Sequence, residues 1–223
     1  IEKAISSVAN ESIRIHGSGR TDSGVHAIEQ VFHFTSNAKR EPRQWIDGIN
    51  SNLPKDILIR WIKEVSIEFD ARRSALLRRY DYLIQHYRPD VFLNGRALFV
   101  YKKLDLVAME KAAKHLIGEN DFSSFRAASC QSNNPIREMK SISFSEGNQL
   151  RVEFIANAYL HHMIRNIMGT LIDVGHGKIE VDKMKEILDA KDRQMASKKV
   201  TAEGLYLFGV KYPDKYQLPT IDI

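Results

Sequence analysis

The chain has 223 residues, of which 43% are hydrophobic and 27% are charged, as is usual for a soluble globular protein. It contains no run of 18 apolar residues, and Cys130 is its single cysteine, so we expect no transmembrane helix and no internal disulfide. Its 33 Lys and Arg exceed its 28 Asp and Glu by five, which is compatible with an ordinary solvated surface or with an acidic partner such as RNA. We therefore expect a cytoplasmic protein of one large or two small domains, with no membrane partner.

The first part of the chain alternates helical and strand-like segments. Residues 1–9 resemble the end of a helix and do not begin with Met, so we expect that a preceding segment is missing. Residues 12–16 and 28–34 alternate between apolar and polar positions, which predicts two strands. Pro42 stands where a helix can begin, and residues 57–65 predict another strand.

The second part of the chain has longer periodic segments. The expected elements are a strand at 76–87, a helix at 106–117, hairpin strands at 136–145 and 149–157, helices at 163–172 and 182–190, and a strand at 205–212. Hairpins mixed with helices predict an α+β fold with a mixed, mostly antiparallel sheet flanked by helices. We expect a boundary close to residues 70–76, which gives domains at 1–74 and 75–223.

A glycine-rich loop, "GSGRTDSGVHA" at residues 17–27, lies between two predicted strands. It could be a plain tight turn, because Gly, Ser and Asp are ordinary turn residues. It could be a phosphate cradle, although it lacks the lysine of a P-loop. It could also be a catalytic loop in which Asp22 presents a carboxylate and Arg20 favours its ionised form. Spacing alone leaves the three open.

Four segments of the chain resemble motifs of the TruA family of tRNA pseudouridine synthases, in the family's order. "GRTDSGVHA" resembles the signature loop G-R-T-D-[AS]-G-V-H-A, and the others are "RRYDYLI" at 78–84, "NAYLHHMIRNIMGTL" at 157–171 and "AEGLYL" at 202–207. The resemblance covers essentially the whole chain, but the family's opening strand has no counterpart. It implies the pseudouridine synthase fold, with two similar α/β halves and a basic cleft between them. The first half would carry the aspartate loop, and the second the other site elements.

The resemblance also implies a reaction and a partner. Members of the family isomerise uridine to pseudouridine in tRNA without cofactor or metal, and work as homodimers. The segments at 130–138 and 212–219 resemble bacterial members that act at positions 38, 39 and 40 of the anticodon stem-loop. The alternatives are a synthase of the same fold for other RNA sites, a catalytically silent RNA-binding module, and a nucleotide or phosphosugar enzyme that uses the glycine loop as an anion cradle.

The family's site residues carry over to matching positions of this sequence. Asp22 would be the catalytic carboxylate, acting as a nucleophile or a base. Arg20 would enter the space that the target base vacates, and Tyr80 would stack on the flipped uracil or take the proton from C5. Arg165, at the edge of the apolar stripe of its helix, would pair with Asp22. Leu205 would pack under the base.

Contacts to RNA are expected from basic side chains. The adjacent His161 and His162 are interpreted as a helix start or as RNA contacts rather than as metal ligands, because no cysteines or helical i, i+4 spacing accompany them. The other candidates for RNA contacts are Arg14, Arg72, Arg78, Arg79 and Lys198. Asp70 and Arg73 depart from the family's F-H-A-R-F-S pattern, so their contribution is left open.

Overall fold

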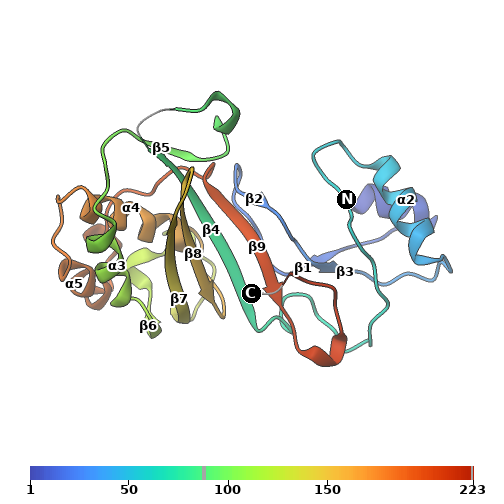
Figure 1. Cartoon of the computed structure of the whole chain (residues 1–223). Coiled ribbons are helices and arrows are strands. Elements are labelled where there is room, and N and C mark those ends of the chain that lie inside the picture. Colours follow the sequence, from blue (N-terminus) through green and yellow to red (C-terminus); the bar gives the residue numbers. More distant parts are fainter. Residues whose placement is uncertain (87–88, 222) are drawn as a thin grey trace. The chain divides into compact units, whose positions relative to one another are not determined.

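The computed structural model describes residues 1–86, 89–221 and 223, and the chain forms two compact units (Figure 1). Unit 1 consists of Ile1–Arg20, Gln30–Leu76 and Val210–Ile221, and unit 2 consists mainly of Thr21–Glu29 and Leu77–Gly209. One of the crossings between the units, after Leu76, lies close to the expected boundary. However, the Asp22 loop belongs to unit 2, and the C-terminal segment from Val210 belongs to unit 1. The division into domains at 1–74 and 75–223 therefore stays a prediction.

Unit 1 is built around two helices, α1 (Glu2–Ala9) and α2 (Pro42–Asn52), which pack against each other (Figure 1). Helix α2 begins where the sequence predicts, because Pro42 has no N–H that needs a partner and because Glu41 and Gln44 form a capping box. The small core of this unit is formed by Ala4, Ile5, Ala9, Ile13, Trp45 and Ile49.

The strands of unit 1 are much shorter than predicted. The segments at 12–16 and 28–34 contribute only β1 (His16–Gly17) and β3 (Phe32–His33), which pair antiparallel, and residues 57–65 form no strand. The N–H of Ile15 donates to Glu2, and the N–H of Ile59 donates to Asn50 at 2.7 Å. Side chains thus take the place of a neighbouring strand, which alternation alone does not reveal.

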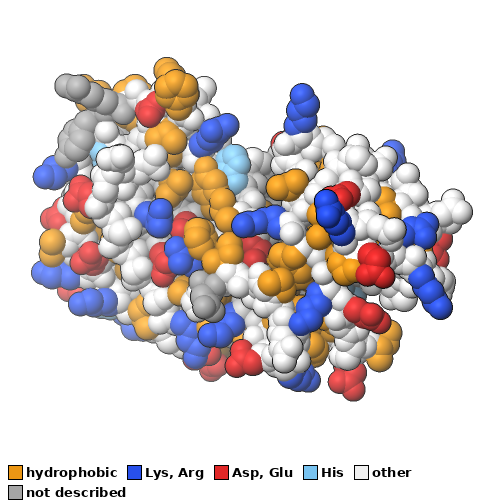
Figure 2. All heavy atoms as spheres, turned by 45° about the vertical axis from the view of Figure 1, so that its right-hand side comes forward, with side chains coloured by type: hydrophobic (Ala, Val, Ile, Leu, Met, Phe, Trp, Pro, Cys, Tyr) orange, Lys and Arg blue, Asp and Glu red, His pale blue; other side chains and the backbone are white. Residues whose placement is uncertain are grey.

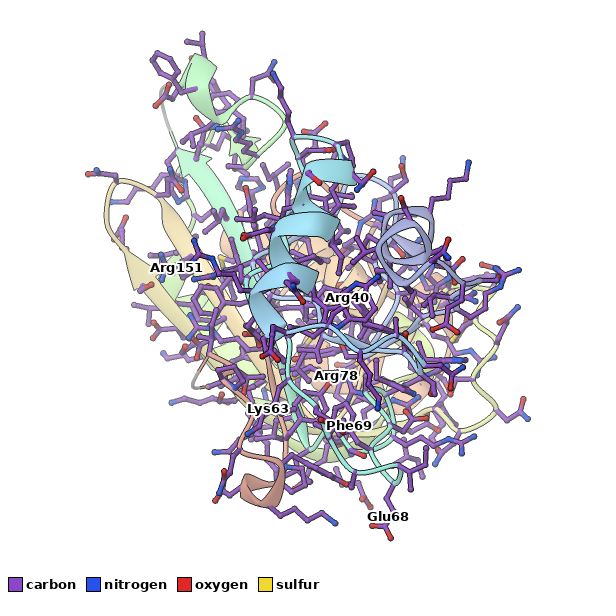
Figure 3. All side chains as sticks on the ribbon, turned by 90° about the vertical axis from the view of Figure 1, so that its right-hand side faces the viewer. Arg40, Lys63, Glu68, Phe69, Arg78 and Arg151 are labelled. Carbon is purple, nitrogen blue, oxygen red and sulfur yellow. The ribbon has the colours of Figure 1, made fainter. Side chains whose placement is uncertain are left out.

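The turn at 69–74 explains one departure from the family pattern. Phe69 is buried against three aromatic rings, whereas Glu68 extends into solvent (Figure 3). The carboxylate of Asp70 accepts the N–H groups of Arg72 and Arg73, each at 2.8 Å. The hydrogen bond from Arg73 is the main cause that lowers the pKa of Asp70. Asp70 therefore stabilises its own turn.

Unit 2 contains a mixed sheet with strand order β2-β9-β4-β8-β7-β6, and β5 is added alongside β4. The strands are β2 (His26–Ala27), β4 (Leu77–His86), β5 (Leu98–Val100), β6 (Gly118–Asp121), β7 (Ile136–Glu146), β8 (Leu150–Ala156) and β9 (Leu205–Lys211). The pairs β4/β8, β7/β8 and β6/β7 are antiparallel, whereas β2/β9 and β4/β5 are parallel. The predicted hairpin and the α+β class are confirmed. Residue 87, the end of the predicted strand 76–87, lies outside the described residues.

Helices α3 (Leu106–Lys114), α4 (Met163–Gly175) and α5 (Lys183–Ala190) lie together on one side of this sheet (Figure 1). Helix α4 is almost entirely buried, and its apolar side chains meet those of β4 and β8 in the main core. Short 3₁₀ turns occur at Val91–Leu93, Ser123–Phe125, Arg193–Met195 and Asp214–Tyr216. The predicted helices are confirmed, although α3 ends at Lys114, before the expected residue 117, and α4 continues to Gly175, beyond the expected residue 172.

The surface carries both signs of charge. On the face shown in Figure 2, Lys and Arg side chains are interspersed with Asp and Glu, so this face has no continuous field of one sign. The predicted basic cleft stays a prediction. Among the described residues, none of the helices combines the length and the hydropathy needed to cross a bilayer.

Unit 1 should lose stability as the pH falls just below 6.5. The Nδ1 atom of His33 accepts the N–H of Ala71 at 3.1 Å, which requires an unprotonated nitrogen. Burial lowers the pKa of His33, although Asp70 opposes this. As the pH drops, the unfolded chain therefore takes up a proton before the folded chain does, and folding becomes less favourable.

Thermal unfolding followed by circular dichroism between pH 7.5 and 5.5 measures this effect, because carboxylates titrate mostly below this window. We expect the melting temperature to fall with pH. A His33→Asn variant, whose amide oxygen can accept the same hydrogen bond, should show a weaker dependence. Some dependence should remain, since burial also lowers the pKa values of His86 and His162. An unchanged slope in the variant would contradict the prediction.

Candidate active site

Asp22 opens a tight turn in unit 2. The N–H of Val25 donates to the Asp22 carbonyl at 3.1 Å, and Gly24 has φ +83°, a conformation that strains any residue with a side chain. A Cβ atom on Gly24 would also lie 3.3 Å from the Cβ of Ala202. Gly24 therefore permits the close approach of this turn to Ala202, whereas a Cβ on Gly19 would meet nothing within 4 Å.

The strand that follows this turn anchors it to the sheet. Strand β2 pairs in parallel with β9, and the N–H of Ile28 donates to the Leu207 carbonyl at 2.8 Å. The His26 ring stacks on Tyr206 with centroids 4.6 Å apart, and its Nε2 lies 3.0 Å from the Gly95 carbonyl oxygen. The position of Asp22 is thus set by backbone pairing and ring packing a few residues away.

Arg165 brings a positive charge from the buried helix α4 to Asp22. Its Nη1 donates to Asp22 Oδ2 at 2.7 Å, and its Nε donates to the Val200 carbonyl at 3.0 Å. Arg165 is only 8% exposed, and a charge in such a place is tolerated when it is paired and hydrogen-bonded. The predicted contact between Arg165 and Asp22 is present in the structure.

Two histidines complete the surroundings of the carboxylate. His161 Nε2 lies 3.2 Å from Asp22 Oδ1, and His162 Nε2 lies 3.3 Å from Asp22 Oδ2. The Nζ of Lys199 lies 3.3 Å from the Nδ1 of His162 and 3.4 Å from its Nε2. Burial is the main cause that lowers the pKa of His162, so its imidazole is neutral near pH 7. The histidines therefore face the carboxylate, which the sequence did not predict.

Asp22, His161 and His162 together offer ligand atoms of the kind that bind zinc, all within 4.8 Å of one another. However, Asp22 Oδ2 is already in an ion pair with Arg165, and Lys199 adds a second positive charge nearby. Both charges oppose the entry of a cation. The arrangement suits an ionised carboxylate better than a metal ion.

Tyr80 lies on β4, where its hydroxyl is affected by the charge of Asp22. Burial raises the pKa of Tyr80 to about 12; Arg78 lowers it, and Asp22 raises it further. Its ring packs edge to face on Tyr159, at 5.1 Å between centroids. Arg78, labelled in Figure 3, donates to the Asn157 carbonyl at 2.7 Å. The phenol of Tyr80 is therefore protonated at neutral pH and is suited to donate a hydrogen bond.

Other predicted residues have varied surroundings. Leu205 is 6% exposed at the start of β9 and belongs to the main core. Arg79 is not a free RNA contact, because it forms ion pairs with Asp81 and Glu153, each at 2.8 Å, and lies over an aromatic ring. Arg14 and Arg20 belong to unit 1, so their placement towards Asp22 stays a prediction.

Comparison with known proteins identifies the family. A family model described as tRNA pseudouridine synthase matches residues 1–72 and 112–213. The chain belongs to the tRNA pseudouridine synthase family. The resemblance to the TruA family is confirmed, and the mixed sheet flanked by helices is consistent with the fold of that family. The matched ranges include Asp22 and Arg165, whereas Tyr80 falls between them.

Several curated relatives within this family carry the name tRNA pseudouridine synthase A. The relative from Yersinia pseudotuberculosis serotype O:1b is 47% identical over 224 residues, which cover 99% of this chain and 84% of that protein. The one from Pectobacterium atrosepticum is 48% identical, covering 98% of this chain and 78% of its own. The relative from Vibrio parahaemolyticus is 45% identical, and the match covers 100% of this chain and 85% of that protein.

Proposed function

We propose that this chain isomerises uridine to pseudouridine in tRNA, at positions 38, 39 and 40 of the anticodon stem-loop, as a cytoplasmic homodimer. One observation carries the proposal: the Asp22 carboxylate, at the head of the family's signature turn, is paired at 2.7 Å with the buried Arg165. The names of relatives with 45–48% identity support the same reaction.

The reaction needs no co-reactant. The N1–C1′ bond breaks, the uracil turns, and a C5–C1′ bond forms; C5 loses a proton and N1 gains one, so substrate and product are isomers. An ionised Asp22 can attack C1′ or C6, or remove a proton from the ribose, and each route returns the carboxylate at the end. Arg165 stabilises the ionised form throughout.

The remaining residues act on the base and on the RNA backbone. Tyr80 offers a flat face to the flipped uracil, a contact worth about 1–3 kcal/mol per base. Leu205 packs below the base, and Arg20 fills the space left in the stem. Arg14 and Arg78 contact phosphates, so binding weakens as salt increases. In this proposal the domain at 1–74 carries the aspartate loop, and the domain at 75–223 carries the other site residues.

Unmodified tRNA transcripts test the function. We expect the chain to form pseudouridine at 38, 39 or 40 wherever uridine stands there, as mapped by carbodiimide treatment and primer extension. Transcripts with cytidine at these positions should give no product. Product confined to other uridines would favour a synthase for different RNA sites, and tight binding without product would favour a silent RNA-binding module. Either outcome contradicts the proposal.

A further inference from the structure

We propose that His161 and His162 are positioning residues, which hold the Asp22 carboxylate from both of its oxygens and leave Oδ1 as the reacting atom. The proposal rests on the proposed catalytic role of Asp22. It assigns the two histidines to the carboxylate instead of to RNA.

The contacts of the two carboxylate oxygens differ. Oδ2 accepts from Arg165 at 2.7 Å and lies 3.3 Å from His162 Nε2. Among the described residues, Oδ1 has a single donor in reach, His161 Nε2 at 3.2 Å. Each carboxylate oxygen has two lone-pair sites. Oδ2 is therefore the more occupied oxygen, and Oδ1 has more of its lone-pair capacity left for the substrate.

The carboxylate indicates which nitrogen of each ring carries the proton. An ionised carboxylate only accepts, so the Nε2 that faces Asp22 in each ring is the nitrogen that can donate to it. Lys199 does not distinguish the two nitrogens of His162, because its Nζ lies 3.3 Å from Nδ1 and 3.4 Å from Nε2. The Ser129 hydroxyl, 3.3 Å from the Nδ1 of His161, is compatible with the Nε2–H form because it can donate to Nδ1.

The backbone of His162 argues against a merely structural helix start. His162 is the N-cap of α4, but its side chain makes no capping hydrogen bond. N-cap side chains that stabilise a helix accept from its first N–H groups, which this ring does not do. His162 also has φ +64°, a strained conformation for a residue with a side chain, and such strain occurs preferentially at functional sites. The strained backbone at the helix start thus accompanies a ring that faces Asp22.

Burial favours a neutral His162, because it is the largest cause that lowers the pKa of this imidazole. The charge of Asp22 on the signature turn opposes this effect, whereas His161, Lys199 and Arg165 lower the pKa further. The positive end of the helix dipole lies at the same place and also disfavours a protonated ring. A neutral His162 can therefore hold the carboxylate without cancelling its charge.

Kinetics and binding of substituted full-length chains separate the two roles. We expect His161→Ala and His162→Ala each to lower the single-turnover rate about 10- to 100-fold through misplacement of the carboxylate, with the tRNA Kd changed less than about 2-fold. His161→Gln and His162→Gln place an amide N–H near the lost Nε2 and should recover most of the rate. His115→Ala, at the C-terminal end of α3 where the ring lies 3.6 Å from Asp182, is the matched control and should change neither the rate nor the Kd.

An opposite pattern would overturn the proposal: a weaker Kd with an unchanged single-turnover rate would make the histidines RNA contacts. Nitrogen-15 shifts of the imidazoles give a measurement independent of activity. We expect both rings in the Nε2–H form, and a Nδ1–H form of His162 would also overturn the proposal. If the unaltered chain makes no pseudouridine, the proposed function fails, and the shifts still report whether the histidines hold the carboxylate.

Discussion

An Asp22→Asn variant should bind tRNA about as tightly as the unaltered chain, but should form pseudouridine at least about 1,000-fold more slowly, in the upper range for loss of an acid–base or nucleophilic group. The amide has nearly the same volume and can still accept from Arg165, so the local structure should persist. However, it cannot act as a base or as a nucleophile of comparable strength. Chemistry is then lost without loss of recognition.

Single-turnover assays with excess protein measure this effect, together with a filter-binding Kd and a melting curve. Asp47→Asn is a suitable control, because Asp47 is an exposed carboxylate whose side chain is 69% accessible and pairs with Arg43 four residues before it. The control should retain full rate. A rate within about 10-fold of the unaltered chain for Asp22→Asn would rule out a catalytic role for this carboxylate.

The sequence predicted unit 2 better than unit 1, for a physical reason. The hairpin and α4 have long, strongly periodic segments, and they bury their apolar faces against each other. In unit 1, short alternating segments satisfy their backbone through side chains, as Ile59 does with Asn50. Alternation predicts which face is apolar, but it does not show whether another strand lies alongside.

The candidate site was predictable where a residue conflicts with its surroundings. Arg165 is a charge among the apolar positions of a helix, and Asp22 is a carboxylate in a glycine turn. A charge that is removed from water needs an oppositely charged or hydrogen-bonding partner, so both residues indicate a site. The position of Lys199 beside His162 has no such signal. It depends on how closely the segment at 197–200 approaches α4, which is a property of packing between distant parts of the chain.

Gly169 makes that close approach possible, and Gly169→Ala should destabilise the protein strongly. A Cβ atom at this position would lie 2.0 Å from the backbone oxygen of Lys198. Backbone atoms cannot rotate away as a side-chain end can, so either helix α4 or the segment must move. Overpacking of this kind typically costs about 1–3 kcal/mol, and a 2.0 Å contact with a carbonyl lies at the severe end of that range.

The movement should also reach the active site. The N–H of Val200 donates to the Arg165 carbonyl at 3.3 Å, and Arg165 Nε donates to the Val200 carbonyl at 3.0 Å. A displaced segment would lengthen both bonds and draw Lys199 away from His162. We therefore expect a lower melting temperature, by about 2–4 °C for each kcal/mol lost, and a slower single-turnover rate in the fraction that remains folded.

Gly147→Ala provides the matched control, because Gly147 lies in the hairpin turn and a Cβ there meets nothing within 4 Å. Its melting temperature and rate should match those of the unaltered chain. If Gly169→Ala melts as the control does, the segment at 197–200 cannot lie against α4 at this distance. The contact of Lys199 with His162 would then be lost as well.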